Sequence, residues 1–187
     1  MRKNFGPQTW LYPMPVLIIG TFDENGKPNA MNAAWGGIYD TNQIIICLGS
    51  HKTTENIKKN KAFTVAFATV ETVTASDYVG IISQNQEPNK INKAGLVYEK
   101  ASKVNAPIFT NYPLTIECEL VDFINEGEGG GNIIGQIVNA SADESILINN
   151  KPDYKKLRPI TFDAVNHQYI ELGEVVAPAF KEGLKLK

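Results

Sequence analysis

The chain has 187 residues, of which 43% are hydrophobic and 20% are charged, a composition typical of globular domains. Eighteen basic and twenty acidic residues give a formal net charge of -2 without a long basic block, so no nucleic-acid partner is expected. The aliphatic runs are much shorter than the ~20 residues that cross a bilayer, so no membrane partner is expected either. Residues 4–15 are too polar and too rich in proline for a signal peptide. A single domain over residues 1–187, located in the cytoplasm, is therefore predicted.

The first half of the chain begins with predicted β-strands. Residues 16–22 are rich in β-branched side chains, and the Asn25-Gly26 dipeptide that follows favours the positive φ of a hairpin turn. The second strand, residues 29–37, is unusual because alanine and glycine surround one large ring, Trp35. The third strand, residues 43–48, shows no polar alternation, so we expect it to be buried on both faces.

Short helices follow these strands. One is predicted over residues 54–60 with Thr53 as its N-cap, and another over residues 74–83. The connection from residue 84 to 112 is long, polar and interrupted by proline, and it should contain a further short helix at residues 90–94. Connections of this length are often functional.

The second half adds more strands. Residues 115–124 alternate, which predicts a half-exposed strand with Cys118 on its apolar face and Glu117 on its polar face. Further strands are predicted at residues 62–68, 133–140, 145–148 and 169–172, and a helical turn at residues 153–157. Many strands, a few short helices and no βαβ alternation together predict a mainly β, antiparallel barrel.

The cysteines and histidines of the sequence give little support to a disulfide or a metal site. Cys47 and Cys118 both lie in apolar strand patterns, which favours buried free thiols over a disulfide. His51 and His167 have no cysteine or carboxylate at metal-ligand spacing, so no metal site is predicted. The glycine-rich residues 127–131 precede a strand instead of a helix, which favours a mobile turn over a dinucleotide-binding loop.

Two adjacent segments could instead hold a planar, phosphorylated ligand. Ser50, Lys52 and Thr53 offer hydroxyls and a cation at a helix N-terminus, where phosphate binds, although ordinary helix capping explains them equally well. In the second strand, small residues would let a flat ring approach the backbone, because bulky side chains would hold it away. For Trp35, contact with such a ring and a place in the core or a dimer interface remain equal alternatives.

A series of short motifs runs along nearly the whole chain in a characteristic order. They are Pro15-Val16, Gly26-Lys27-Pro28-Asn29, Asn32-Ala33-Ala34-Trp35, Lys52-Thr53-Thr54-Glu55-Asn56-Ile57, Phe63-Thr64-Val65, Asp77-Tyr78-Val79-Gly80, Ser83, Asn89-Lys90-Ile91, Glu117-Cys118-Glu119-Leu120, Gly135-Gln136-Ile137-Val138 and the tail from Tyr169 to Gly173. In order and spacing this series resembles the flavin reductase-like family with the FMN-binding split barrel, especially its flavoredoxin branch.

The resemblance implies an antiparallel split β-barrel that binds FMN and acts as a homodimeric oxidoreductase. Its electron donor would be NAD(P)H or a redox partner protein. A non-enzymatic electron carrier, and a β-barrel module that binds a small ligand without redox turnover, remain alternatives. The resemblance assigns no catalytic acid or base. The cofactor-binding residues that it implies are Asn29, Ala33, Ala34 and Trp35 beside the isoalloxazine ring, Ser50, His51, Lys52 and Thr53 at the phosphate, and Lys90 reaching in from the long connection.

Two positions depart from the family pattern. Thr41-Asn42 stands where members commonly carry a proline pair. Gly130-Gly131-Asn132 stands where many have a Gly-Asp-His type turn. Substrate chemistry that depends on that histidine is therefore not assigned to this chain.

Overall fold

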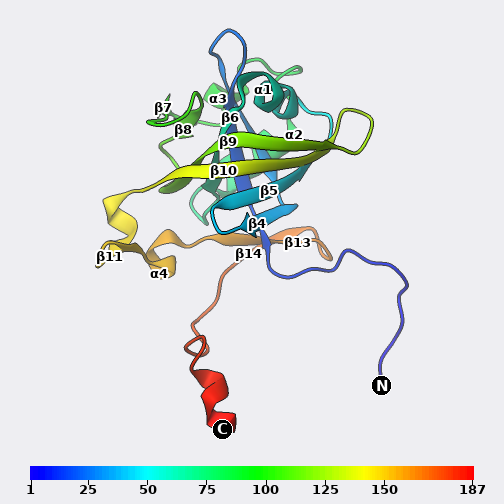
Figure 1. Ribbon diagram of the computed structural model, residues 1–187, viewed down its shortest axis with the longest axis vertical. Helices are drawn as coiled ribbons and strands as arrows, with labels where there is room; N and C mark the ends of the chain where they lie inside the picture. Colours follow the sequence, from blue (N-terminus) through cyan, green and yellow to red (C-terminus); the bar gives the residue numbers. More distant parts are fainter.

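The computed structural model describes residues 1–187 and centres on a seven-stranded antiparallel sheet with the order β3-β2-β6-β9-β10-β5-β4 (Figure 1). The strands are β2 (Leu17–Phe22), β3 (Pro28–Ala33), β4 (Gly36–Asp40), β5 (Gln43–Leu48), β6 (Ala62–Phe67), β9 (Leu114–Asn125) and β10 (Gly131–Ala142). β3 and β4 occupy opposite ends of this order, although only Ala34 and Trp35 separate them along the chain. The sheet therefore curls until its ends meet. Because β3 and β4 do not pair, the barrel is split, as expected from the sequence.

Smaller elements surround the barrel. The helices are α1 (Lys52–Asn60), α2 (Val73–Ile81), α3 (Lys90–Lys93) and α4 (Tyr154–Leu157), with 3₁₀ turns at Glu144–Ile146 and Glu182–Leu186. The short strands are β1 (Met14–Pro15), β7 (Tyr98–Lys100), β8 (Pro107–Phe109), β11 (Leu147–Ile148), β12 (Lys151–Pro152), β13 (Ile160–Asp163) and β14 (Gln168–Glu171). The three strands β1, β13 and β14 form a separate sheet. None of the helices is long and apolar enough to cross a membrane.

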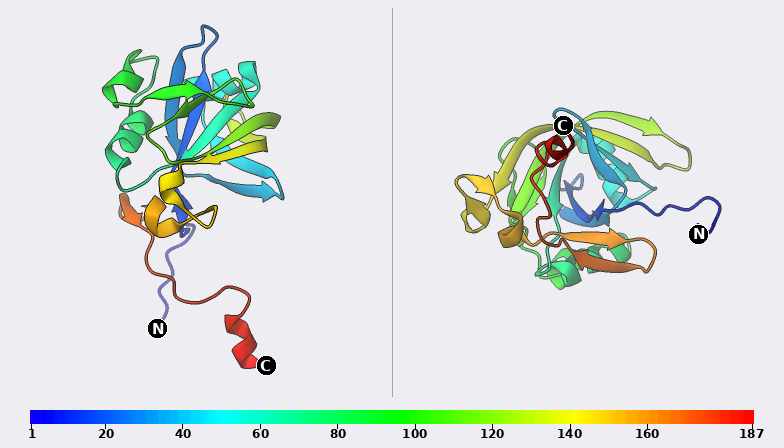
Figure 2. Two further views of the ribbon diagram at one scale, coloured as in Figure 1. Left: turned by 90° about the vertical axis from the view of Figure 1, so that its left-hand side faces the viewer. Right: turned by 90° about the horizontal axis from the view of Figure 1, so that it is seen from below.

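β2 carries the core on both of its faces because successive side chains of a strand point to opposite sides. Leu17 and Ile19 belong to the cluster inside the barrel, together with Phe63. Ile18 belongs to a second cluster that includes Val79 of α2. The helices α2 and α3 lie together against this outer side of the barrel (Figure 2). Each such fully buried aliphatic side chain contributes about 1.5–3 kcal/mol of transfer free energy.

Two expectations about the early strands are corrected by the structure. The predicted strand over residues 29–37 is interrupted at Ala34 and Trp35, where the chain passes from one end of the sheet to the other. β5 is not buried on both faces: Ile46 is fully buried, whereas Cys47 is exposed. The expectation of two buried thiols therefore holds only for Cys118, whose pKa burial raises to about 12.

Glu117 is also placed differently from the expectation, because it is fully buried instead of facing solvent. Its carboxylate accepts hydrogen bonds from Ser102 Oγ at 2.9 Å, the Lys103 backbone N–H at 2.7 Å and Asn139 Nδ2 at 2.7 Å. Burial acts to raise the pKa of Glu117, but these hydrogen bonds outweigh it and the pKa is lowered. The loop between β7 and β8 thus covers a strand face that alternation alone marks as exposed.

Candidate functional site

A continuous cleft runs along β3, between the beginning of α1 and the side of α2. It has two parts, of about 380 Å³ and 290 Å³, which share Met31, Asn32, His51, Gly80 and Ile81. The first part, called here the aromatic end, is lined among others by Ala33, Ala34, Trp35, Asp77, Phe162 and Tyr169. The second part, called the polar end, is lined among others by Asn29, Lys52, Thr53, Ser83, Gln84 and Lys90.

Close packing of α2 on β3 forms one wall of this cleft. A Cβ added at Gly80 would lie only 2.9 Å from Cβ of Asn32, so a larger residue at Gly80 would push the helix away from the strand. Asn32 Nδ2 donates a hydrogen bond of 3.2 Å to the Ser76 carbonyl and strengthens this contact. The position of α2 along the strand is therefore closely defined.

The polar end is built around the start of α1. The N-cap is His51 and not Thr53, since the helix begins at Lys52. Thr53 is buried, and its hydroxyl oxygen accepts a hydrogen bond of 2.8 Å from Asn29 Nδ2, which leaves the Thr53 hydroxyl proton free for a ligand. Thr54 Oγ1 donates to the Gly49 carbonyl at 2.8 Å and tightens the preceding turn. Backbone amides of the first helical turn, which have no partner within the helix, complete an anion-binding arrangement.

Two buried amide oxygens at the polar end have no hydrogen-bond partner. Asn29 is 1% exposed, and its Oδ1 atom is unpaired although its Nδ2 atom is bonded to Thr53. Gln84 Oε1 is likewise unpaired, while Gln84 Nε2 donates to the Pro28 carbonyl at 3.0 Å. An unpaired buried acceptor costs about 1–3 kcal/mol. Both residues line the polar end of the cleft, which makes their amide oxygens candidate acceptors for the hydroxyl groups of a ligand.

Lys90 is a buried cation at the same end, and it is 3% exposed. Its ammonium donates to the carbonyls of Ile82 at 2.8 Å and of Val79 at 3.3 Å, and no carboxylate lies within ion-pair distance. Burial lowers the pKa of Lys90 to about 8. An ammonium has three donors, so one N–H remains for a ligand. An anion in the polar end would supply the missing counter-charge.

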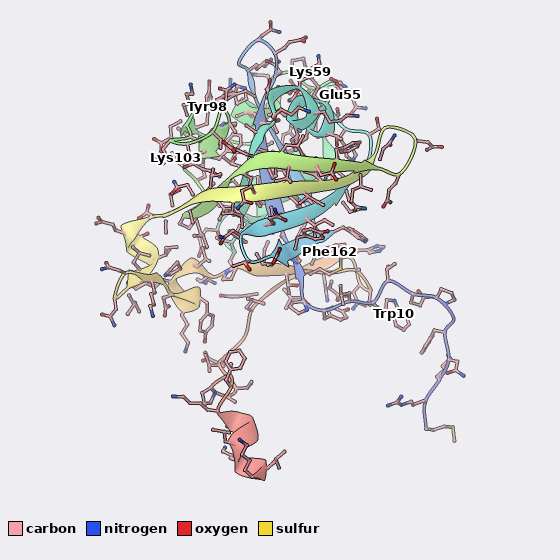
Figure 3. The ribbon with its side chains drawn as sticks, viewed as in Figure 1. Trp10, Glu55, Lys59, Tyr98, Lys103 and Phe162 are labelled. Carbon is pink, nitrogen blue, oxygen red and sulfur yellow. The ribbon has the colours of Figure 1, made fainter.

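The aromatic end combines small residues with rings. Trp35 is 51% exposed at the break between β3 and β4, and Figure 3 shows Phe162 on β13, next to this end of the barrel. Tyr169 Oη donates to Asp77 Oδ1 at 2.8 Å and accepts a hydrogen bond of 3.3 Å from Asn32 Nδ2. Burial, followed by the hydrogen bond to Asp77, raises the pKa of Tyr169 to about 12, so this phenol is protonated at neutral pH.

The structure gathers nearly all of the predicted site residues in this one cleft. Ser50 is the exception, because it lines neither part. Sequence reasoning assigned no site role to Asp77, Gln84, Phe162 or Tyr169. Asp77 and Tyr169 belong to motifs that carry the family resemblance, and that was the available signal for both. Gln84 and Phe162 have no such signal, since only the folding of the long connection and of β13 brings them to the cleft.

Comparison with known proteins places the chain in a family. Residues 10–158 match the model of the flavin reductase like domain, so the chain belongs to this family, as its motifs indicated. Its structure is similar to flavoredoxin of Desulfovibrio vulgaris (Miyazaki F), with a TM-score of 0.92 and 34% identity over 98% of this chain and 100% of that one. Flavoredoxin from Methanosarcina acetivorans is similar at a TM-score of 0.90 and 27% identity, with 100% of both chains covered.

One more distant structure shares the fold, and one more distant protein matches part of the sequence. Nitrilotriacetate monooxygenase component B from Bacillus cereus has a TM-score of 0.79 at 21% identity, with 90% of this chain and 88% of that chain covered. An uncharacterized protein from Aeropyrum pernix is 24% identical over 121 residues, and this match spans 63% of the present chain and 46% of the relative. The chain thus covers less than half of the Aeropyrum protein.

The unpaired Lys90 leads to a testable pH dependence in the ligand-free protein. Because its folded-state pKa is about 8, below the ordinary value of 10.5, the unfolded state binds more protons between these two values. The free energy of unfolding should therefore rise as the pH increases from 8 to 10. Solvent screening should keep this slope below the limit of ~1.4 kcal/mol per pH unit. Urea unfolding at successive pH values would measure it, and Lys90→Met should remove this contribution. Lys93→Met, which replaces an exposed lysine, should keep the wild-type slope. A loss of slope in that variant equal to the loss in Lys90→Met would contradict the assignment.

Proposed function

We propose that this protein is an oxidoreductase that binds FMN in the cleft and passes electrons from a reduced donor through the flavin to an acceptor. One observation carries the proposal: a single cleft joins a strand of small residues beside aromatic rings to a buried polar end with unpaired acceptors and a cation. FMN has the same division into a planar ring, a polyol chain and a phosphate. Membership of the flavin reductase like family supports the proposal.

In this proposal the phosphate lies at the beginning of α1. His51, Lys52 and Thr53 lie at that position, and Lys90 lines the same polar end of the cleft. The Lys52 ammonium has only a 3.5 Å contact with Glu55, so it is available for an anion. Ser50 precedes this turn without lining the cleft, so we propose no direct contact for it.

The remaining parts of the ligand follow from the unpaired groups and from the available space. The buried oxygens of Asn29 and Gln84 would accept hydrogen bonds from the hydroxyls of the polyol chain. Ala33 and Ala34 leave room for the ring against the backbone at the seam between β3 and β4, and Trp35 borders the same space. The bound flavin would supply the redox chemistry, while the protein positions it, excludes water and sets the local charge.

The proposal includes one domain over residues 1–187 and a cytoplasmic location. The electron donor is NAD(P)H or a redox partner protein. Purified protein that contains FMN should show the visible absorption of an oxidised flavin, and anaerobic mixing with NADH or NADPH should bleach it within seconds to minutes. A yellow protein that is not reduced by either nucleotide would favour an electron carrier over a reductase. A colourless protein that cannot be reconstituted with FMN would contradict the proposal and favour a non-redox binding module.

Replacing Lys52 should separate recognition of the phosphate from recognition of the ring. A hydrogen bond to a charged group is worth about 1.5–3 kcal/mol, so Lys52→Ala should weaken FMN binding by roughly 10-fold to 150-fold. Riboflavin, which lacks the phosphate, should bind the variant and the wild type about equally. Fluorescence quenching with both ligands and the apo proteins measures these affinities.

The matched control for Lys52 is Lys59→Ala. Lys59 lies on the same helix, but it pairs with Glu24 at 2.9 Å, away from the cleft. Its replacement should leave both affinities unchanged. Equal losses of riboflavin and FMN binding in Lys52→Ala would mean that this turn shapes the cleft without recognising the phosphate.

We also propose a homodimer, because apolar groups remain uncovered around the seam. β4 is an edge strand, and its Ile38 and Tyr39 are 73% and 54% exposed. The N-terminal segment lies outside the barrel and carries the exposed Trp10 (Figure 3). Such uncovered edges and rings are typical of interfaces.

Light scattering should accordingly give a mass of twice 20.6 kDa at micromolar concentration. Replacing both Ile38 and Tyr39 with lysine should shift the protein toward the monomer, since two charges would have to be buried in the interface. A wild-type monomer that is fully occupied by FMN would contradict this part of the proposal.

A further inference from the structure

Asp77 is the acidic residue that lines the cleft, and it lies at the aromatic end. It occupies the middle of α2, between Val73 and Ile81, beyond the first turn where the helix dipole would stabilise a carboxylate. Its side chain is fixed in place by the hydrogen bond from Tyr169, which is itself held by Asn32. The carboxylate is therefore directed by its surroundings and is not a freely moving surface group.

No cation compensates this carboxylate. Asp77 takes part in no ion pair, and no lysine or arginine lines the aromatic end. The other titratable residues that line this end are Cys47, His51 and Tyr169. The lysines of the cleft, Lys52 and Lys90, line only the polar end. A partly buried carboxylate with one neutral donor costs stability that an asparagine would not. The cost in stability suggests that the negative charge of Asp77 has a function.

We propose that Asp77 lowers the reduction potential of the bound flavin. The inference rests on the proposed function, because it needs the flavin ring at the aromatic end of the cleft. Uptake of two electrons and one proton from the donor adds one negative charge to the ring. A fixed carboxylate lining the same space repels that negative charge. Because the bound ring would exclude water, this repulsion would be screened less than in solution. Asp77 would thus make the reduced flavin a stronger reductant toward its acceptor.

The tyrosine has a different role from the carboxylate that it contacts. Tyr169 stays protonated and donates its hydrogen to Asp77, so it orients the carboxylate and offsets part of its charge. Removing the phenol would leave the full negative charge in place. Loss of the Asp77 charge and loss of the Tyr169 hydrogen bond therefore have different consequences for the reduction potential. This difference separates an electrostatic effect from a general disturbance of the cleft wall formed by α2.

The decisive measurement is the two-electron midpoint potential of FMN bound to the protein, obtained by reductive titration against a reference dye. Asp77→Asn keeps the size of the side chain and an acceptor for Tyr169 but removes the charge. It should strengthen binding of reduced FMN relative to oxidised FMN by about tenfold, which corresponds to a potential about 30 mV higher for a two-electron couple. Tyr169→Phe should not raise the potential.

A second signature comes from the pH dependence of the same potential. A nearby carboxylate favours the neutral, doubly protonated form of the reduced ring over its anion. The pH at which the slope of potential against pH decreases should consequently be lower in Asp77→Asn than in the wild type. A merely structural role of Asp77 would leave this pH unchanged.

Glu99→Gln provides the matched control, because it removes one negative charge from β7, outside both parts of the cleft. It should leave the potential and its pH dependence as in the wild type. Should Asp77→Asn fail to fold, Asp77→Ser removes the same charge with a smaller polar side chain, and the same increase is expected.

The outcomes separate the inference from the proposed function. An Asp77 variant that binds oxidised FMN normally and shows an unchanged potential would overturn the inference and leave the function standing. An increase of the same size in Tyr169→Phe or Glu99→Gln would also overturn it, because the effect would not come from the Asp77 charge. A wild type that binds no FMN would overturn both.

Discussion

The fold depends on the two-residue link between β3 and β4. These strands end up at opposite ends of the sheet order, so the link can be that short only if the sheet curls into a barrel. The same requirement leaves a seam in which β3 and β4 do not pair. Ala34 and Trp35 lie at this seam, and the cleft opens beside them. The site is thus a consequence of how the barrel closes, and small residues on β3 are what keep the space open.

The polar end of the cleft is built at the expense of stability. Two buried oxygens, of Asn29 and Gln84, have no hydrogen-bond partner, and the buried ammonium of Lys90 has no ion-pair partner. Each of these groups costs free energy of folding while no ligand is present. A ligand with hydroxyls and an anionic group removes all of these costs at once, so binding and folding should be coupled. The surface ion pairs of the molecule differ from the cleft in this respect, because their side chains are exposed and already have partners.

The charges of the cleft are separated along its length. Lysines line the polar end, whereas the carboxylate of Asp77 lines the aromatic end. Such an arrangement orients a ligand that carries its negative charge at one extremity, and it makes additional negative charge at the other extremity unfavourable. If the cleft binds FMN as proposed, affinity for the cofactor and the ease of reducing it can then be set by different residues.

The sequence by itself determined the strand-rich barrel, the hairpin at Asn25-Gly26, the small residues that follow this hairpin and the polar turn before α1, because these depend on local periodicity and turn chemistry. It also indicated the family, through the order of its motifs. Only the tertiary structure decided the exposure of Cys47, the burial of Glu117 and the joining of Tyr169 to the wall formed by α2. Each of these features depends on which distant segment covers a given face of a strand. Side-chain alternation in the sequence indicates that a strand has two faces, but it does not indicate what packs against either face.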